Sequence, residues 1–156
     1  MNRLKHSLFC ALALAAGLSR AGELKYSIFH HFFDEKPGGQ PLGACHGGAV
    51  IDKKGNIYIT TDTIRGIVVF TPEGKFLRAC GPMRIHGLEI REEDGTEYMY
   101  GARPTDHQVV KLTMTGETVW TLEFPKESDL YKEPRGFNPC AVTVAPDGSI
   151  FVADGY

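Results

Sequence analysis

Short apolar stretches alternate with polar turns along most of the chain, and many of these turns end in glycine. Three segments repeat one order: an apolar strand, a polar turn, and a second strand rich in β-branched and aromatic residues. Their turn glycines are Gly55, Gly95 and Gly148. Glycine readily adopts the positive φ that a tight hairpin turn requires. The pattern therefore predicts three β-hairpins, over 46–60, 86–100 and 139–154.

A second type of hairpin follows the first two. Residues 67–71 precede a turn at Gly74, and residues 108–113 precede a turn at Gly116, with another short strand after each turn. The two complete units therefore contain four antiparallel strands each, and their first turn glycines lie 40 residues apart. Four strands per period of about 40–50 residues are typical of a β-propeller blade. We predict an all-β fold, a β-propeller with four-stranded antiparallel blades at about 46–80 and 86–124 and a half blade at 139–156.

Two more segments fit this architecture. Residues 24–33 are rich in aromatic residues and predict one further strand before the first blade. Residues 125–136 are polar and contain two prolines, which indicates an exposed loop between the second and third blades. The expected content is thus about two and a half blades plus an N-terminal strand.

The N-terminus has the anatomy of a secretory signal peptide over residues 1–21. Arg3 and Lys5 are basic, residues 8–18 form an apolar run of 11 residues, and residues 19–21 include small side chains before the expected cleavage point. A membrane-spanning helix needs about 20 apolar residues, so this run is too short to anchor the chain. We expect an exported protein, secreted or periplasmic, with no membrane span, whose propeller part covers residues 22–156.

Composition and charge narrow the possible partners. The chain has 156 residues, 42% of them hydrophobic and 23% charged, which is ordinary for a soluble globular protein. Its formal net charge is −2, and removal of the signal peptide leaves 14 basic against 19 acidic residues, a charge of −5. Nucleic-acid binding through a basic surface therefore has no support.

Length adds a second expectation. A six-bladed ring at about 40 residues per blade needs about 240 residues, whereas 135 remain after the signal peptide. We expect the chain to be the N-terminal part of a longer propeller, with further C-terminal blades needed to close the ring. An open stack of this kind would expose a sheet edge and the apolar face of its last half blade.

Three cysteines lie beyond the signal peptide, at Cys45, Cys80 and Cys140. An exported chain can oxidise its cysteines, but an odd number cannot pair completely within one chain. Their pairing stays open. Cys45 adjoins a histidine, and we interpret it as a small buried residue rather than a thiolate ligand.

Two histidines occupy matching places in the first two units. His46 and His86 each lie nine residues before the turn glycine of their hairpin. The first strand of a blade is innermost, so equivalent positions of successive blades lie at one height along the central channel. Zinc binds imidazole nitrogen, and a catalytic zinc keeps an open position beside three protein ligands. Both histidines are candidate zinc ligands; the alternative is that they hydrogen-bond to channel water. The third unit carries Asn138 and Pro139 at this height.

Three stretches resemble NHL-repeat propellers: His86-Gly87-Leu88, His107 to Leu112, and Asn138 to Tyr156. More narrowly, residues 86–112 and 137–156 resemble the peptidylamidoglycolate lyases. Those enzymes cleave the carbon–nitrogen bond of a peptidyl-α-hydroxyglycine and release a peptide amide and glyoxylate.

The resemblance implies roles for particular residues. It makes His86 a zinc ligand, the main-chain carbonyl of Leu88 a ligand of a structural calcium, and Tyr156 the base that acts on the substrate hydroxyl. A phenol has a pKa near 10, so a nearby metal or cation must lower it for that role. Arg65 lies nearest to the family's catalytic arginine, about three residues out of register, and Asp62 lies closer to that place.

Two other functions stay open. A non-catalytic propeller would bind a protein, peptide or glycan at its loop face. A lactonase-like hydrolase would need acidic metal ligands on the inner strands, where this chain has histidine instead. The expected partner is therefore a peptide or small-molecule substrate, or a protein.

Overall fold

The computed structural model describes residues 25–155, which form three antiparallel β-sheets and almost no helix. The first sheet has the order β1-β2-β3-β4 and the second has the order β5-β6-β7-β8. The third contains only β9 and β10. The strands are β1 (Ala49–Ile51), β2 (Ile57–Thr60), β3 (Ile67–Phe70), β4 (Phe76–Cys80), β5 (Leu88–Glu93), β6 (Thr96–Arg103), β7 (Gln108–Thr113), β8 (Thr118–Leu122), β9 (Pro139–Val144) and β10 (Ile150–Asp154).

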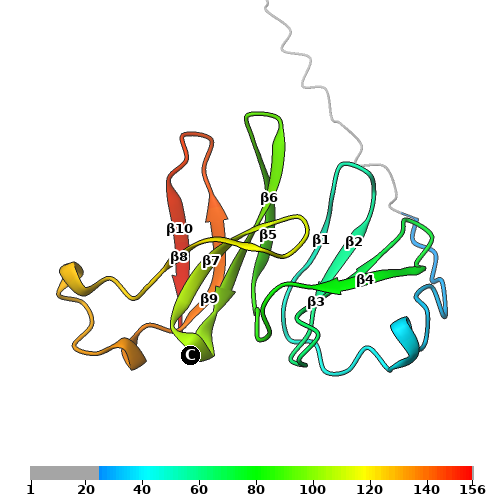
Figure 1. Ribbon diagram of the computed structural model, residues 1–156, viewed down its shortest axis with the longest axis horizontal. Coiled ribbons are helices and arrows are strands. Elements are labelled where there is room, and N and C mark those ends of the chain that lie inside the picture. Colours follow the sequence, from blue (N-terminus) through cyan, green and yellow to red (C-terminus); the bar gives the residue numbers. More distant parts are fainter. Residues whose placement is uncertain (1–24, 156) are drawn as a thin grey trace, which may run out of the picture.

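These sheets confirm the predicted fold: two four-stranded units followed by half of a third. Within each sheet, every strand pairs with the next strand along the chain, as a blade requires. Figure 1 shows the sheets side by side along the long axis of the molecule, with β1, β5 and β9 as neighbours. The hairpin glycines have the expected positive φ, at 83° for Gly55, 81° for Gly95 and 87° for Gly148.

Two hydrophobic clusters join the sheets. The first lies between the first two sheets, and the second lies between the second and third. In β3, all four residues are buried, because this strand contacts apolar side chains on both faces. The first cluster contains Tyr58, Ile67, Val69, Ile85, Leu88, Met99, Val110 and Leu112, and the second contains Tyr100, Ala102, Val109, Phe137, Val142 and Val144.

The prediction of an N-terminal strand over residues 24–33 is wrong for residues 25–33, the part that the structure describes. Residues 25–33 form no strand, and Tyr26, Ile28 and Phe29 are each more than three-quarters exposed. The segment reaches the first sheet only at its end. There the Phe33 ring lies 4.7 Å from the Phe70 ring, and the Phe76 amide donates to the Asp34 carboxylate at 2.7 Å. Aromatic content predicted a strand, but side-chain contacts rather than a sheet ladder hold this segment.

The connections are short 3-10 turns and loops. They comprise η1 (Pro37–Gly39), η2 (Pro104–Asp106), η3 (Lys126–Ser128) and η4 (Pro134–Gly136). The last two lie within residues 125–136, which are mostly exposed and confirm the predicted loop. No helix among residues 25–155 is long and apolar enough to cross a membrane. The signal peptide predicted over residues 1–21 lies outside the described residues.

The last hairpin presents the open edge that its sequence predicted. In the first two sheets the second strand pairs on both sides, whereas β10 pairs only with β9 among the described strands. Phe151 on β10 is 59% exposed. This face is apolar and shallowly hollowed around Val142, Phe151 and Val152.

Neighbouring inner strands approach each other very closely at the glycine that follows each candidate histidine. The Gly48 amide donates to the His86 carbonyl at 2.9 Å. A Cβ on Gly47 would lie 2.0 Å from that same carbonyl oxygen, and a Cβ on Gly87 would lie 2.6 Å from the Cys140 carbonyl oxygen. Real Cβ atoms essentially never make such contacts with backbone. Glycine is therefore required at both positions for the sheets to meet.

We expect Gly47→Ala to lower the free energy of unfolding by about 2–3 kcal/mol, because the new methyl group displaces backbone that cannot move independently. Urea denaturation followed by circular dichroism measures this. Gly101→Ala is the matched control, since the three atoms nearest to its Cβ would belong to the Ile85 and Val110 side chains rather than to backbone, at 3.1 Å or more. We expect the control to stay within about 1 kcal/mol of the unmutated protein. Equal effects of both substitutions would contradict the close approach.

Candidate functional site

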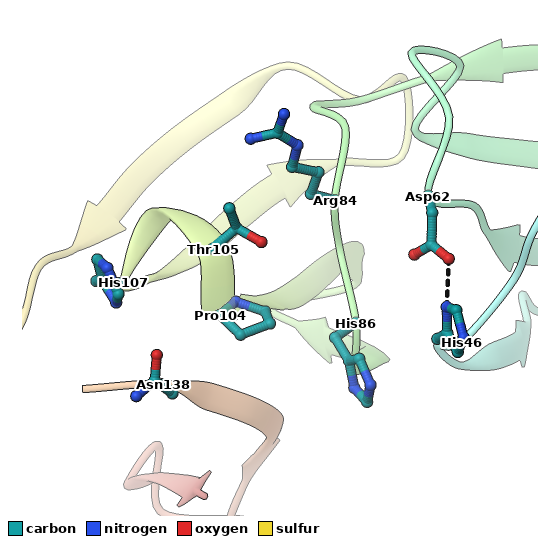
Figure 2. A pocket seen from close by; sticks show the side chains of 8 residues that line it. All are labelled: His46, Asp62, Arg84, His86, Pro104, Thr105, His107 and Asn138. Carbon is teal, nitrogen blue, oxygen red and sulfur yellow. Dashed lines mark hydrogen bonds and ion pairs between the residues drawn. The ribbon is translucent and has the colours of Figure 1, made fainter. Parts of the chain in front are cut away.

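One open pocket of about 770 Å³ lies where the inner strands begin. His46 and His86 precede β1 and β5, and Asn138 precedes β9, so three neighbouring sheets each supply one residue at matching positions. His46 and His86 thus line the same pocket; their role as metal ligands stays a prediction. Loops at the same end of the sheets complete the wall. Figure 2 shows the eight lining residues, which are His46, Asp62, Arg84, His86, Pro104, Thr105, His107 and Asn138.

His46 is paired with a carboxylate. Its Nδ1 contacts Oδ2 of Asp62, which follows β2, and Figure 2 draws the two side chains end to end. Both side chains are partly open to solvent, at 73% and 37% exposure. A carboxylate accepts hydrogen bonds, so the neutral imidazole carries its proton on Nδ1. Nε2 is then the nitrogen that His46 offers to a ligand.

The other two pocket histidines contact main-chain carbonyls instead. Nδ1 of His86 donates to the Cys140 carbonyl at 3.0 Å, and Nδ1 of His107 donates to the Phe137 carbonyl at 2.7 Å. Because a carbonyl can only accept, these contacts place the proton on Nδ1 in both rings. Each bond also joins the second sheet to the third, because Cys140 lies in β9 and Phe137 lies just before it. Such bonds to the remote nitrogen orient many metal-binding histidines.

Arg84 is the pocket residue that sequence reasoning missed. It lies in the β4–β5 connection with a positive φ of 64°. Its guanidinium has no hydrogen-bond or ion-pair partner within residues 25–155, and Figure 2 shows it beside Thr105. Arg103 differs, since it is paired with Asp106 at 2.9 Å. The only signal in the sequence was that Arg84 precedes His86 by two residues.

The other predicted site residues lie elsewhere. The guanidinium of Arg65 donates to the main chain of residues 37–41 and does not line the pocket. Leu88 begins β5, where it is paired with Gly101, and its side chain belongs to the first hydrophobic cluster. Tyr156 lies outside the described residues. The structure thus brings together His46 and His86 and adds Asp62, Arg84 and His107 beside them.

Cys45 is exposed, so its interpretation as a buried residue is wrong. Its Sγ contacts the Gly43 carbonyl at 3.5 Å. Partial desolvation raises the pKa of the Cys45 thiol, and the negative charge of Asp62 adds to that rise. The protonated thiol therefore predominates at neutral pH, which disfavours a thiolate ligand here. None of Cys45, Cys80 and Cys140 forms a disulfide in the structure.

The pocket offers the kind of donor atom that zinc prefers, but it does not offer enough of them. Imidazole nitrogens are preferred zinc ligands. Within the part of the chain that the structure describes, however, no three His, Cys, Asp or Glu side chains gather closely enough to hold a metal ion. A complete zinc site would need a further ligand from outside residues 25–155.

No family model matches the chain, and no curated protein matches it either. Solved structures do. Virginiamycin B lyase from Staphylococcus aureus is 20% identical, with a TM-score of 0.51 over 69% of this chain and 34% of that one. A catalytically inactive variant of that enzyme with quinupristin is 18% identical, with a TM-score of 0.52 and the same coverage. A protein of unknown function from Bacteroides caccae is 14% identical, with a TM-score of 0.50 over 68% of this chain and 37% of that one.

The chain has the β-propeller fold. It spans about a third of the length of these solved structures. At such low identity the likeness shows the fold alone, so the narrower resemblance to NHL repeats and to peptidylamidoglycolate lyases stays a prediction.

The hydrogen bonds of the pocket predict one tautomer for all three histidines. When neutral, His46, His86 and His107 should each carry the proton on Nδ1, because each Nδ1 faces an acceptor. Long-range proton–nitrogen correlation spectra of the ¹⁵N-labelled protein distinguish the two tautomers. His30, which does not line the pocket, serves as the internal reference. An Nε2–H tautomer at His86 or His107 would contradict the described bonds.

Proposed function

We propose that the chain is part of an exported propeller lyase that cleaves a carbon–nitrogen bond, acting on peptidyl-α-hydroxyglycine or a close relative. The observation that carries this proposal is the joint placement of His46, His86 and Arg84 around one open pocket. The resemblance in residues 86–112 and 137–156 supports the substrate class. The solved lyase with the same fold supports catalysis on a propeller, although its name gives a different substrate, virginiamycin B.

The reaction needs groups that the pocket provides. Cleavage removes the substrate hydroxyl proton, forms the aldehyde carbonyl of glyoxylate, and breaks the bond to the amide nitrogen, which takes up a proton. Because Nδ1 of His46 and Nδ1 of His86 each face an acceptor, Nε2 is the nitrogen through which either ring would bind a ligand. In the proposal Tyr156 is the base, as the resemblance implies: it takes the proton of the substrate hydroxyl and returns a proton to the amide nitrogen, while His46 and His86 serve as metal ligands.

Arg84 takes the role that the sequence assigned to Arg65. A substrate that yields glyoxylate carries a carboxylate beside the reacting carbon. A guanidinium binds a carboxylate through two parallel hydrogen bonds and fixes its orientation. Arg84 is the pocket cation available for this contact, because its guanidinium has no partner within residues 25–155.

The proposal includes two metal ions, zinc and calcium, with named residues as their ligands. Zinc, which polarises a substrate oxygen when bound, would be held by His86 and His46 with a further donor from outside residues 25–155. A structural calcium would take the main-chain carbonyl of Leu88, since calcium binds oxygen ligands.

A second function is favoured by the incomplete donor set. Because the described residues gather no three metal ligands, the pocket also suits a non-catalytic module that binds a peptide carboxyl terminus. Arg84 and Asn138 would then recognise the peptide end, and no bond would be broken.

Turnover separates the two functions. The protein is incubated with a peptidyl-α-hydroxyglycine, and the peptide amide is measured by mass spectrometry while bound zinc is measured by elemental analysis. We expect His86→Ala to abolish turnover and to lower bound zinc, with substrate still bound. Binding without turnover in the unmutated protein would favour the second function, and the absence of both would overturn the two together.

Arg84→Gln tests the carboxylate contact. We expect it to weaken binding of the substrate, or of a peptide with a free carboxyl terminus, by about fivefold to tenfold, because a charged hydrogen bond is lost at an exposed site. Isothermal titration calorimetry measures the change. Arg135→Gln is the control, since Arg135 is exposed and paired only with Glu133 at 3.2 Å. Equal affinities of the two variants would argue against Arg84 as the anion-binding residue.

A further inference from the structure

The β2–β3 loop, residues 61–66, holds the segment that leads into His46. The two terminal nitrogens of the Arg65 guanidinium donate to separate carbonyls, that of Pro37 at 2.6 Å and that of Pro41 at 3.2 Å. Further along, the Asp62 amide donates to the Ala44 carbonyl at 2.9 Å. This loop thus forms three hydrogen bonds to residues 37–44, and the last of them, at Ala44, lies two residues before His46.

The loop is itself well fixed. Thr61 is 1% exposed, and its hydroxyl donates to the Gly66 carbonyl at 3.0 Å and contacts the Thr63 hydroxyl at 2.8 Å. Its amide donates to the same Gly66 carbonyl at 2.8 Å. The Arg65 guanidinium also lies over the Phe76 ring at 5.5 Å, which limits its orientations. A closed turn, buried at its two ends by Thr61 and Gly66, therefore carries both Asp62 and Arg65.

The same loop sets the ring of His46 as well as its main chain, because Asp62 contributes the carboxylate that Nδ1 of His46 contacts. His86 is held differently. Its amide donates to the Ala102 carbonyl at 2.8 Å, and its carbonyl accepts from Gly48, so the sheets fix its main chain. His46 precedes the first strand and depends on the loop.

We propose that Arg65 is a positioning residue of the pocket. It acts from outside the pocket, through residues 37–44, and together with Asp62 it sets where the His46 imidazole stands relative to His86. The inference rests on the proposed function in treating His46 as a working group of the site. Its geometry, however, belongs to the unliganded protein and can be tested without substrate.

The test measures the reactivity of single histidines. The unliganded protein is treated with diethyl pyrocarbonate, and carbethoxylation of His46, His86 and His107 is followed by peptide mass spectrometry, with amide hydrogen exchange over residues 38–44 as a second readout. We expect Arg65→Gln to speed exchange over 38–44 and to change the His46 rate by about fivefold, the population effect of losing about one net hydrogen bond. The rates of His86 and His107 should stay unchanged.

Two further variants separate the effect of Asp62 on His46 from the effect of Arg65. Asp62→Asn should change the His46 rate while exchange over 38–41 stays as in the unmutated protein, because Arg65 still holds Pro37 and Pro41. Arg65→Lys keeps the cation but offers one nitrogen where the guanidinium offers two, so its effect should lie between those of the unmutated protein and Arg65→Gln. It also serves if Arg65→Gln fails to fold.

Arg135→Gln is the control for loss of a surface guanidinium and should change no rate. The proposal is overturned if the Arg65 variants leave His46 unchanged, or if all three histidines change together, which would mean general loosening. Failure of the lyase proposal shows in turnover and leaves these rates untouched, so the two results are distinguishable.

Discussion

The close approach of neighbouring inner strands is the constraint on which the rest of the structure depends. At Gly47 and Gly87 the main chains of adjacent sheets come so near that no side chain fits between them. The hydrogen bond from the Gly48 amide to the His86 carbonyl is possible only at this separation. In both sheets the residue just before this glycine is a histidine, so the contact that joins the sheets also brings His46 and His86 to one pocket. The pocket is therefore a consequence of how the sheets pack.

Packing and chemistry are coupled through the same few bonds. Nδ1 of His86 and Nδ1 of His107 both donate to carbonyls of the chain at or before β9. These bonds help to hold the third sheet against the second and at the same time choose the tautomer of each ring. A change that loosens the sheets would also disturb the histidine rings of the pocket, so the stability of the fold and the geometry of the pocket cannot vary independently here.

Much of the fold follows from local rules that the sequence displays. Hairpin glycines, apolar strands and the recurring four-strand unit specify the sheets, and the matched places of His46 and His86 predicted that they lie near each other, as they do in the pocket. Features that depend on distant contacts did not follow. Residues 25–33 look like a strand, but in the structure they pair with none of the described strands. Arg65 was a candidate from the sequence, and only the fold shows that its guanidinium is hydrogen-bonded to the Pro37 and Pro41 carbonyls, whereas Arg84 lines the pocket.

The pocket also has an internal order of charge. At one side the Asp62 carboxylate contacts His46, and toward the other side the Arg84 guanidinium lies near Thr105 (Figure 2). An anionic group is attracted to Arg84 and repelled by Asp62, so a substrate with one carboxylate has a single favourable direction in the pocket. A site with three uniformly neutral histidines would bind the same molecule in either direction; the Asp62–His46 pair and the unpaired Arg84 together give it polarity.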